Sequence, residues 1–148
     1  MTLRVRPHHL IDIITQYGAG IPFEPADYGH AVHTVAAQTL GDLETELELV
    51  VGADDICAPC RNLVEGRCVD LVGTLDPPVS KQEYNDALDQ RLLDRLGLRE
   101  GQRLSVADYA RVLWAHLEGL EGLCSHPGEE RAARGRKLQA GLQKMGVG

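Results

Sequence analysis

Leucines recur at helical spacing between residues 81 and 96 of the chain. Four of them share one face of an α-helix: Leu88, Leu92, Leu93 and Leu96. Before this stretch, Ser80 and Glu83 have the spacing of a capping box, and after it Gly97 is a typical helix end. The pattern therefore predicts a helix from Ser80 to Leu96.

Four other segments have helical patterns with recognisable ends. Pro7 can occupy the first turn of an apolar helix that stops at Gly18. Apolar residues also recur at helical spacing over Ala26–Leu40, and Ser105 is placed to cap a helix that continues to Leu117. Pro127 opens the last predicted helix. We therefore expect a mainly helical chain.

One segment alternates instead with the period of a strand that has one buried face. It runs from Thr45 to Val51, with Leu47, Leu49 and Val51 on one side and Glu46 and Glu48 on the other. We expect an α+β fold, mainly helical, in which four or five helices surround a short sheet. A cysteine-rich metal loop should follow this strand directly, and residues 1–148 should form a single domain.

Composition and charge narrow the classes of function. Hydrophobic residues make up 43% of the chain and charged residues 25%, which is ordinary for a soluble domain. The formal charge of −7 argues against broad nucleic-acid binding, because such binding needs lysines and arginines to neutralise phosphates. No apolar run reaches membrane-spanning length, and residues 1–10 contain no signal-peptide core. We expect a cytoplasmic protein without a membrane partner.

Cysteine spacing is the strongest chemical signal. Cys57 and Cys60 are separated by two residues, and Cys68 follows eight positions later. Two thiolates at this spacing can bind one centre from a tight loop, to which a third cysteine can return. The pattern predicts a metal centre, with an iron-sulfur cluster, 4Fe-4S, as first choice. Zinc is the alternative, although its usual pattern has two close pairs of ligands.

The fourth ligand is not decided by spacing. Cys124 is the first choice, because it completes a four-thiolate set and lies near a predicted helix start. The alternatives are His126, His9 and Asp12, of which the last two are three residues apart on the first predicted helix.

Other polar groups have a plainer interpretation beside a chemical one. Asp54 and Asp55 are adjacent carboxylates that could act as a general acid and base. We expect them instead to accept hydrogen bonds from loop amides. His30 and His33 have the spacing for a second mononuclear metal site, whereas the plainer interpretation places one against the core and the other in solvent. The Cys57 and Cys60 pair as a redox dithiol is a further alternative.

Two motifs together resemble a known family. These are Arg6-Pro7-His8-His9-Leu10-Ile11 and Asp54-Asp55-Ile56-Cys57 with Cys60 and Cys68. They resemble a bacterial and archaeal family catalogued as a domain of unknown function, number twelve eighty-four, whose members are suspected iron-sulfur proteins. The family's typical opening has a cysteine where this chain has Asp12. The resemblance therefore implies three of four thiolates, with Cys124 or Asp12 completing the set.

Three functional hypotheses follow. The first is an iron-sulfur protein with a redox, sensor or Lewis-acid enzyme role, acting on an unknown small molecule or redox partner. The second is a structural zinc module that binds or regulates a partner. The third is a mononuclear metal hydrolase or oxygenase that uses His8, His9 and Asp12, or the His30 and His33 pair. The sequence leaves open whether the protein is an enzyme, and also its oligomeric state.

Overall fold

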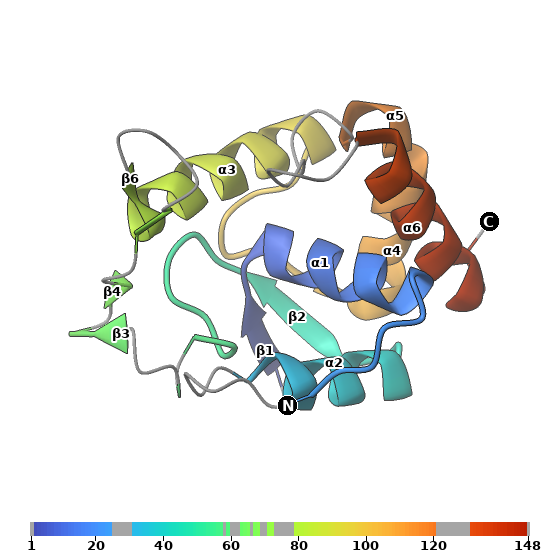
Figure 1. Ribbon diagram of the computed structural model, residues 1–148, viewed down its shortest axis with the longest axis horizontal. Helices are drawn as coiled ribbons and strands as arrows, with labels where there is room; N and C mark the ends of the chain where they lie inside the picture. Colours follow the sequence, from blue (N-terminus) through green and yellow to red (C-terminus); the bar gives the residue numbers. More distant parts are fainter. Residues whose placement is uncertain are drawn as a thin grey trace.

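The chain has a mainly helical α+β fold, as the sequence predicts (Figure 1). The structure is a computed structural model, and it describes residues 2–24, 31–57, 59, 63–65, 67–68, 71–72, 79–120 and 131–147. Within these ranges, the helices of ten residues or more are α1 (Pro7–Gly18), α2 (Val32–Gly41), α3 (Lys81–Leu96), α4 (Val106–Ala115) and α6 (Arg131–Lys144). A four-residue helix, α5 (Leu117–Leu120), precedes α6.

The main sheet has three strands: β1 (Thr2–Val5), β2 (Glu46–Leu49) and β7 (Arg103–Ser105). β2 lies in the middle, parallel to β1 and antiparallel to β7. Leu47 and Leu49 are fully buried, and Glu46 is exposed, so the predicted alternation is confirmed within a shorter strand. The sequence did not predict β7, because three residues are too few to establish a period.

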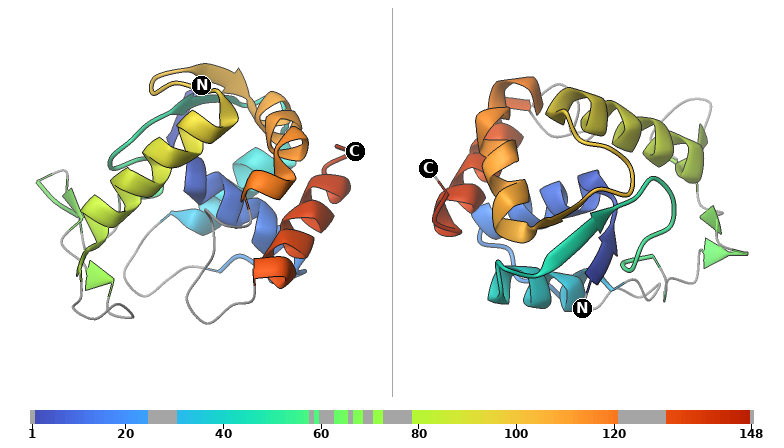
Figure 2. Two further views of the ribbon diagram at one scale, coloured as in Figure 1. Left: turned by 90° about the horizontal axis from the view of Figure 1, so that it is seen from above. Right: turned by 180° about the vertical axis from the view of Figure 1, so that it is seen from behind.

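Two small hairpins follow β2 in the chain. They consist of β3 (Leu63–Val64) with β4 (Arg67–Cys68), and β5 (Leu71–Val72) with β6 (Val79–Ser80). β4, β5 and β6 contact α3, and both Figure 1 and the right view of Figure 2 show the hairpins near the beginning of that helix, away from the main sheet. Cys68 therefore belongs to a segment that α3 supports.

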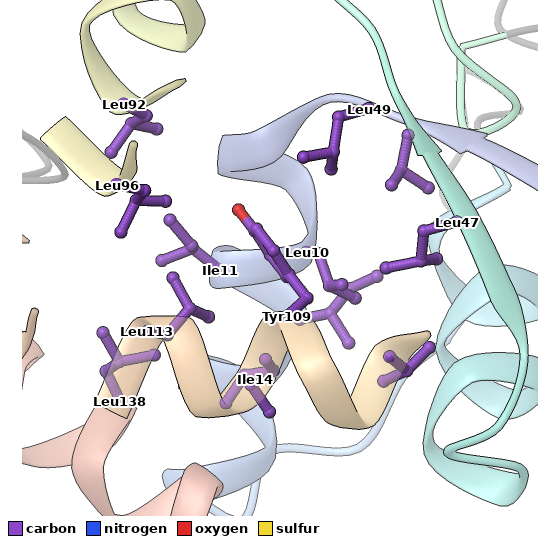
Figure 3. Close-up of a cluster of buried hydrophobic side chains, with 14 of the residues drawn as sticks. Leu10, Ile11, Ile14, Leu47, Leu49, Leu92, Leu96, Tyr109, Leu113 and Leu138 are labelled. Atoms are coloured by element: carbon purple, nitrogen blue, oxygen red, sulfur yellow. The ribbon is translucent and has the colours of Figure 1, made fainter. Parts of the chain in front are cut away.

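Helix α1 lies at the centre of the core. Leu10, Ile11, Ile13 and Ile14 are all buried in the hydrophobic core, and α1 packs closely against α6 and also contacts α3. Figure 3 shows side chains from α1, β2, α3, α4 and α6 meeting in one cluster around Tyr109. The hydroxyl of Tyr109 donates to the carbonyl of Pro7 at 3.0 Å, so its polar end is satisfied inside the core.

Most predicted helix ends agree with the structure. The Ser80 side chain accepts from the amide of Glu83, Ser105 caps α4 in the same way, and Gly97 ends α3 with a φ of 70°. α2 begins at Val32, since Ala31 acts as its N-cap and donates its amide to the carbonyl of Ile56. The first part of the predicted Ala26–Leu40 helix, residues 26–30, lies outside the described residues. The predicted helix start at Pro127 lies outside the described residues.

Helices α1 and α6 touch backbone to backbone. A Cβ atom on Gly18 would lie 1.8 Å from the carbonyl oxygen of Lys137, and one on Gly141 would lie 2.1 Å from the carbonyl oxygen of Ile14. Both distances are far shorter than any van der Waals contact. The two helices therefore need glycine at both positions to approach as they do.

We expect Gly141→Ala to lower the free energy of unfolding by about 1–3 kcal/mol, because the added methyl group must push α6 away from α1. A lower free energy of unfolding would be informative, because replacing glycine by alanine normally stabilises a helix by up to about 1 kcal/mol. Urea denaturation measures the change. Gly41→Ala is the matched control, since a Cβ atom at that position would have nothing within 4 Å and its φ is ordinary. Equal effects of the two substitutions would refute the close helix contact.

Candidate metal centre

The loop after β2 returns alongside β1 and so meets the start of α1. The amide of Asp55 donates to the carbonyl of Arg4 at 2.9 Å, and the amide of Arg4 donates to a carboxylate oxygen of Asp55 at 2.9 Å. Ile56 is buried in the core at 3% exposure. These contacts fix the backbone immediately before Cys57.

Asp54 is the centre of this junction. Its Oδ2 atom accepts hydrogen bonds from the amide of Arg6 and from Nδ1 of His9, both at 2.7 Å. Its Oδ1 atom accepts from the amides of Ile56 at 3.0 Å and Cys57 at 3.1 Å. Asp54 thus binds loop amides as expected from the sequence, and its two oxygens already have four donors, which is their full capacity.

Three potential ligand atoms gather at the same place. A ring nitrogen of His9, a carboxylate oxygen of Asp54 and the sulfur of Cys57 all lie within 4.8 Å of one another. The Asp54 side chain is fully buried, and the His9 side chain is 17% exposed. In the part of the chain that the structure describes, this is the one group of three such atoms.

The charges at this junction are strongly coupled. Burial acts to raise the pKa of Asp54, but the His9 ring and the hydrogen bonds from His9, Arg6 and Cys57 lower that pKa to about 2. Burial and the negative charge of Asp54 raise the pKa of the Cys57 thiol to about 12. Cys57 is therefore a neutral thiol at pH 7 in the metal-free protein. A bound cation reverses this, because metal-bound thiols are deprotonated.

Arg6 joins this junction to α3. Its guanidinium is only 2% exposed, and it lies 2.8 Å from a carboxylate oxygen of Asp86 and 2.9 Å from one of Asp89. Asp89 is fully buried, and its Oδ1 atom also accepts from the amide of His8 at 2.9 Å and from Nδ1 of His8 at 2.8 Å. A buried ionic network therefore fixes the start of α1 against α3.

The same network reaches Cys68. The Cys68 amide donates to Oε1 of Gln82 at 2.9 Å, and Nε2 of Gln82 donates to Asp86, which pairs with Arg6. Arg6 in turn donates its own amide to Asp54, whose other oxygen holds Cys57. The two cysteine segments are thus connected through one continuous set of hydrogen bonds.

The structure brings together only some of the predicted site residues. His9 and Cys57 meet, whereas Cys68 is half-buried in β4 and is not part of their group. Asp12 forms an ion pair with Arg134 of α6. The Nδ1 atom of His33 is buried and has no hydrogen-bond partner among the described residues. Four other candidates lie outside the described residues: His30, Cys60, Cys124 and His126.

Sequence reasoning missed the buried partners on α3. Asp89 lies three and four positions before Leu92 and Leu93, so it shares their buried face. Gln82 and Asp86 extend the same face toward the start of the helix. A carboxylate on an apolar stripe predicts a buried cationic partner, and that signal was present in the pattern.

His8 should make the stability of the metal-free protein depend on pH. Burial acts to lower the pKa of His8, but its hydrogen bond to Asp89 and the charge of Asp89 outweigh burial and raise the pKa above 6.5. Since the folded-state pKa is the higher one, the ionic contribution is complete below the unfolded pKa and is lost as the pH rises through the folded pKa.

We therefore compare wild type with His8→Asn, whose amide can still donate a neutral hydrogen bond to Asp89. The stability advantage of wild type should shrink by about 1 kcal/mol between about pH 5.5 and about pH 9. Urea denaturation in the presence of a chelator measures both proteins. A difference that is constant with pH would show that folding does not raise the pKa of His8.

Fold and site define a class: a small, mainly helical α+β domain with a His, Asp and Cys group where the loop after β2 meets α1. The family model described as Protein of unknown function (DUF1284) matches residues 26–126, and the chain belongs to that family. The family resemblance seen in the sequence is thus confirmed. The match includes Cys57 and Cys68 but begins after α1.

No curated protein and no solved structure matches the chain. None of the described helices is both long and apolar enough to cross a membrane.

Proposed function

We propose that this protein binds a metal centre on the loop that carries Cys57, Cys60 and Cys68, with an iron-sulfur cluster of the 4Fe-4S type as the centre. The supporting observation is that the Cys57 sulfur, a His9 nitrogen and an Asp54 oxygen lie within 4.8 Å of one another although they come from two distant parts of the chain. Thiolate and imidazole together suit iron-sulfur clusters and zinc, and exclude a magnesium or calcium type of site.

The electrostatics favour the same proposal. A half-buried thiol beside a buried carboxylate is a costly arrangement if the sulfur ionises without a cation. Metal binding removes that cost, because the cation stabilises the thiolate and releases its proton. The role that follows is redox, sensing or Lewis-acid catalysis on a small molecule or redox partner.

A second candidate is a single zinc ion in a structural or regulatory module. Bonds of about 2.3 Å to sulfur and about 2.0 Å to nitrogen place two ligands of one tetrahedral ion about 3.5 Å apart. A ring nitrogen of His9 and the Cys57 sulfur are already within 4.8 Å of each other, so one shared tetrahedral ion also suits this pair. The zinc candidate predicts that chelation unfolds the chain.

Elemental analysis and an absorption spectrum of anaerobically purified protein test the proposal. An iron-sulfur cluster gives iron and sulfide in about four equivalents each and a broad visible band. Cys57→Ser and Cys68→Ser should both lose the metal, with circular dichroism used to verify that they remain folded.

A content of about one zinc per chain, without sulfide, would contradict the iron-sulfur cluster and support the zinc module instead. Protein that contains neither iron nor zinc after growth with both metals, and that takes up neither on reconstitution, would refute the proposal.

A further inference from the structure

The fourth ligand of the proposed centre can be inferred from contacts rather than from spacing. Among the described candidates, Asp12 is engaged with Arg134, whereas His9 already lies with Cys57. Asp12 is also about half exposed, while His9 is largely enclosed at 17% exposure. Burial favours His9, because a ligand shielded from water is held in one position.

Asp54 does not compete with His9 for this role. Its four acceptor positions are taken by the amides of Arg6, Ile56 and Cys57 and by Nδ1 of His9. A metal bond would have to displace one of these buried hydrogen bonds. Asp54 is therefore suited to orient a ligand rather than to be one.

The contact with Asp54 selects one nitrogen of His9. A carboxylate 2.7 Å from Nδ1 holds the ring proton on that atom, which leaves the lone pair of Nε2 free. Metal-binding histidines generally donate their second ring nitrogen to a carboxylate or carbonyl in this way, which fixes the tautomer and increases the basicity of the ligand.

We propose that His9 is the fourth ligand of the metal centre and binds through Nε2, with Asp54 as its positioning residue. This inference rests on the proposed function, and it selects a three-cysteine, one-histidine centre instead of a four-cysteine one. Metal binding then forms one bond from Nε2 to the ion, the bound thiols release their protons to solvent, and Nδ1 keeps its proton.

The contacts of Asp54 support this assignment. The same carboxylate holds the amide of Cys57 and the ring of His9, so one side chain places both ligands. The amide of Arg6, the residue just before α1, donates to that carboxylate as well. The two residues are 48 positions apart in the sequence, yet a ring nitrogen of His9 lies within 4.8 Å of the Cys57 sulfur.

The test compares four variants of the anaerobically purified protein: His9→Ala, His9→Cys, Cys124→Ser and His8→Asn. Metal content and the absorption spectrum are measured for each, with circular dichroism to verify folding. His8→Asn is the matched control, because His8 is the neighbouring histidine and pairs with Asp89 instead. Pulsed electron paramagnetic resonance with ¹⁵N-labelled histidine gives an independent reading for a reduced iron centre.

We expect His9→Ala to lower the metal content or affinity at least about tenfold. His9→Cys should retain metal with an altered spectrum, because sulfur replaces nitrogen. Cys124→Ser and His8→Asn should retain the wild-type content, and wild type should show a ¹⁵N coupling that His9→Cys lacks.

Full metal content in His9→Ala, together with loss of metal in Cys124→Ser, would overturn the histidine assignment and leave the metal proposal in place. Wild-type protein without metal would instead refute the proposed function itself. If His9→Ala fails to fold, the comparison of His9→Cys with wild type decides the question, since an unchanged spectrum and ¹⁵N coupling would exclude His9.

Discussion

Replacing Asp89 by asparagine should lower the free energy of unfolding by about 3–5 kcal/mol. Asp89 is fully buried and neutralises the Arg6 guanidinium, which is itself only 2% exposed. Without this carboxylate, the ion-pair partner that Arg6 keeps among the described residues is Asp86, whose side chain is 34% exposed. Removing one partner of a buried ion pair is strongly destabilising, because the remaining charge cannot reach water.

Urea denaturation of the metal-free protein measures this effect, and Asp108→Asn is the matched control. Asp108 also pairs with an arginine, Arg111, but both side chains are more than half exposed. The control should change the free energy of unfolding by no more than about 1 kcal/mol. A comparably small change in Asp89→Asn would show that the buried network does not fix α3 to the start of α1.

Replacing Asp54 by asparagine should weaken metal binding by about 10–100-fold. The new amide keeps one oxygen for the loop amides, but its NH₂ group replaces the oxygen that accepts from His9 and Arg6. Nδ1 of His9 must then accept a hydrogen bond, so its proton moves to Nε2 and blocks the proposed ligand atom. The Arg6 amide also loses its acceptor, which should destabilise the fold by about 1–3 kcal/mol.

Competition with a chromophoric chelator measures the affinity, and Asp55→Asn serves as the neighbouring control. Asp55 accepts the Arg4 amide through one oxygen, which asparagine can still supply. The affinity of the control should stay within about threefold of wild type. Unchanged affinity in Asp54→Asn, with metal still bound, would show that Asp54 does not position a ligand.

Local chemistry was sufficient to predict several elements. The Ser80 cap, the Gly97 end and the leucine stripe of α3 depend on residues within a few positions of each other, and the structure agrees with all of them. The alternation around β2 likewise reports its buried face directly. Element ends were less certain, as at α2, where a distant hydrogen bond from Ala31 to Ile56 sets the start.

Part of the candidate site was also visible in the sequence. The spacing of Cys57, Cys60 and Cys68 indicates metal chemistry without knowledge of the fold, and His9 was among the possible fourth ligands. The interpretation of Asp54 as a residue that binds loop amides agrees with its contacts. The metal itself remains a prediction.

The amino-acid sequence by itself determined which faces of the helices and strands are apolar and where most elements begin and end, because these features depend on near neighbours. Only the tertiary structure decided which faces meet. Gly18 contacts α6, Arg6 pairs with Asp89 83 positions away, and His9 meets Asp54 45 positions away. Periodicity identifies a buried face but not its partner, since that choice depends on the packing of the whole chain.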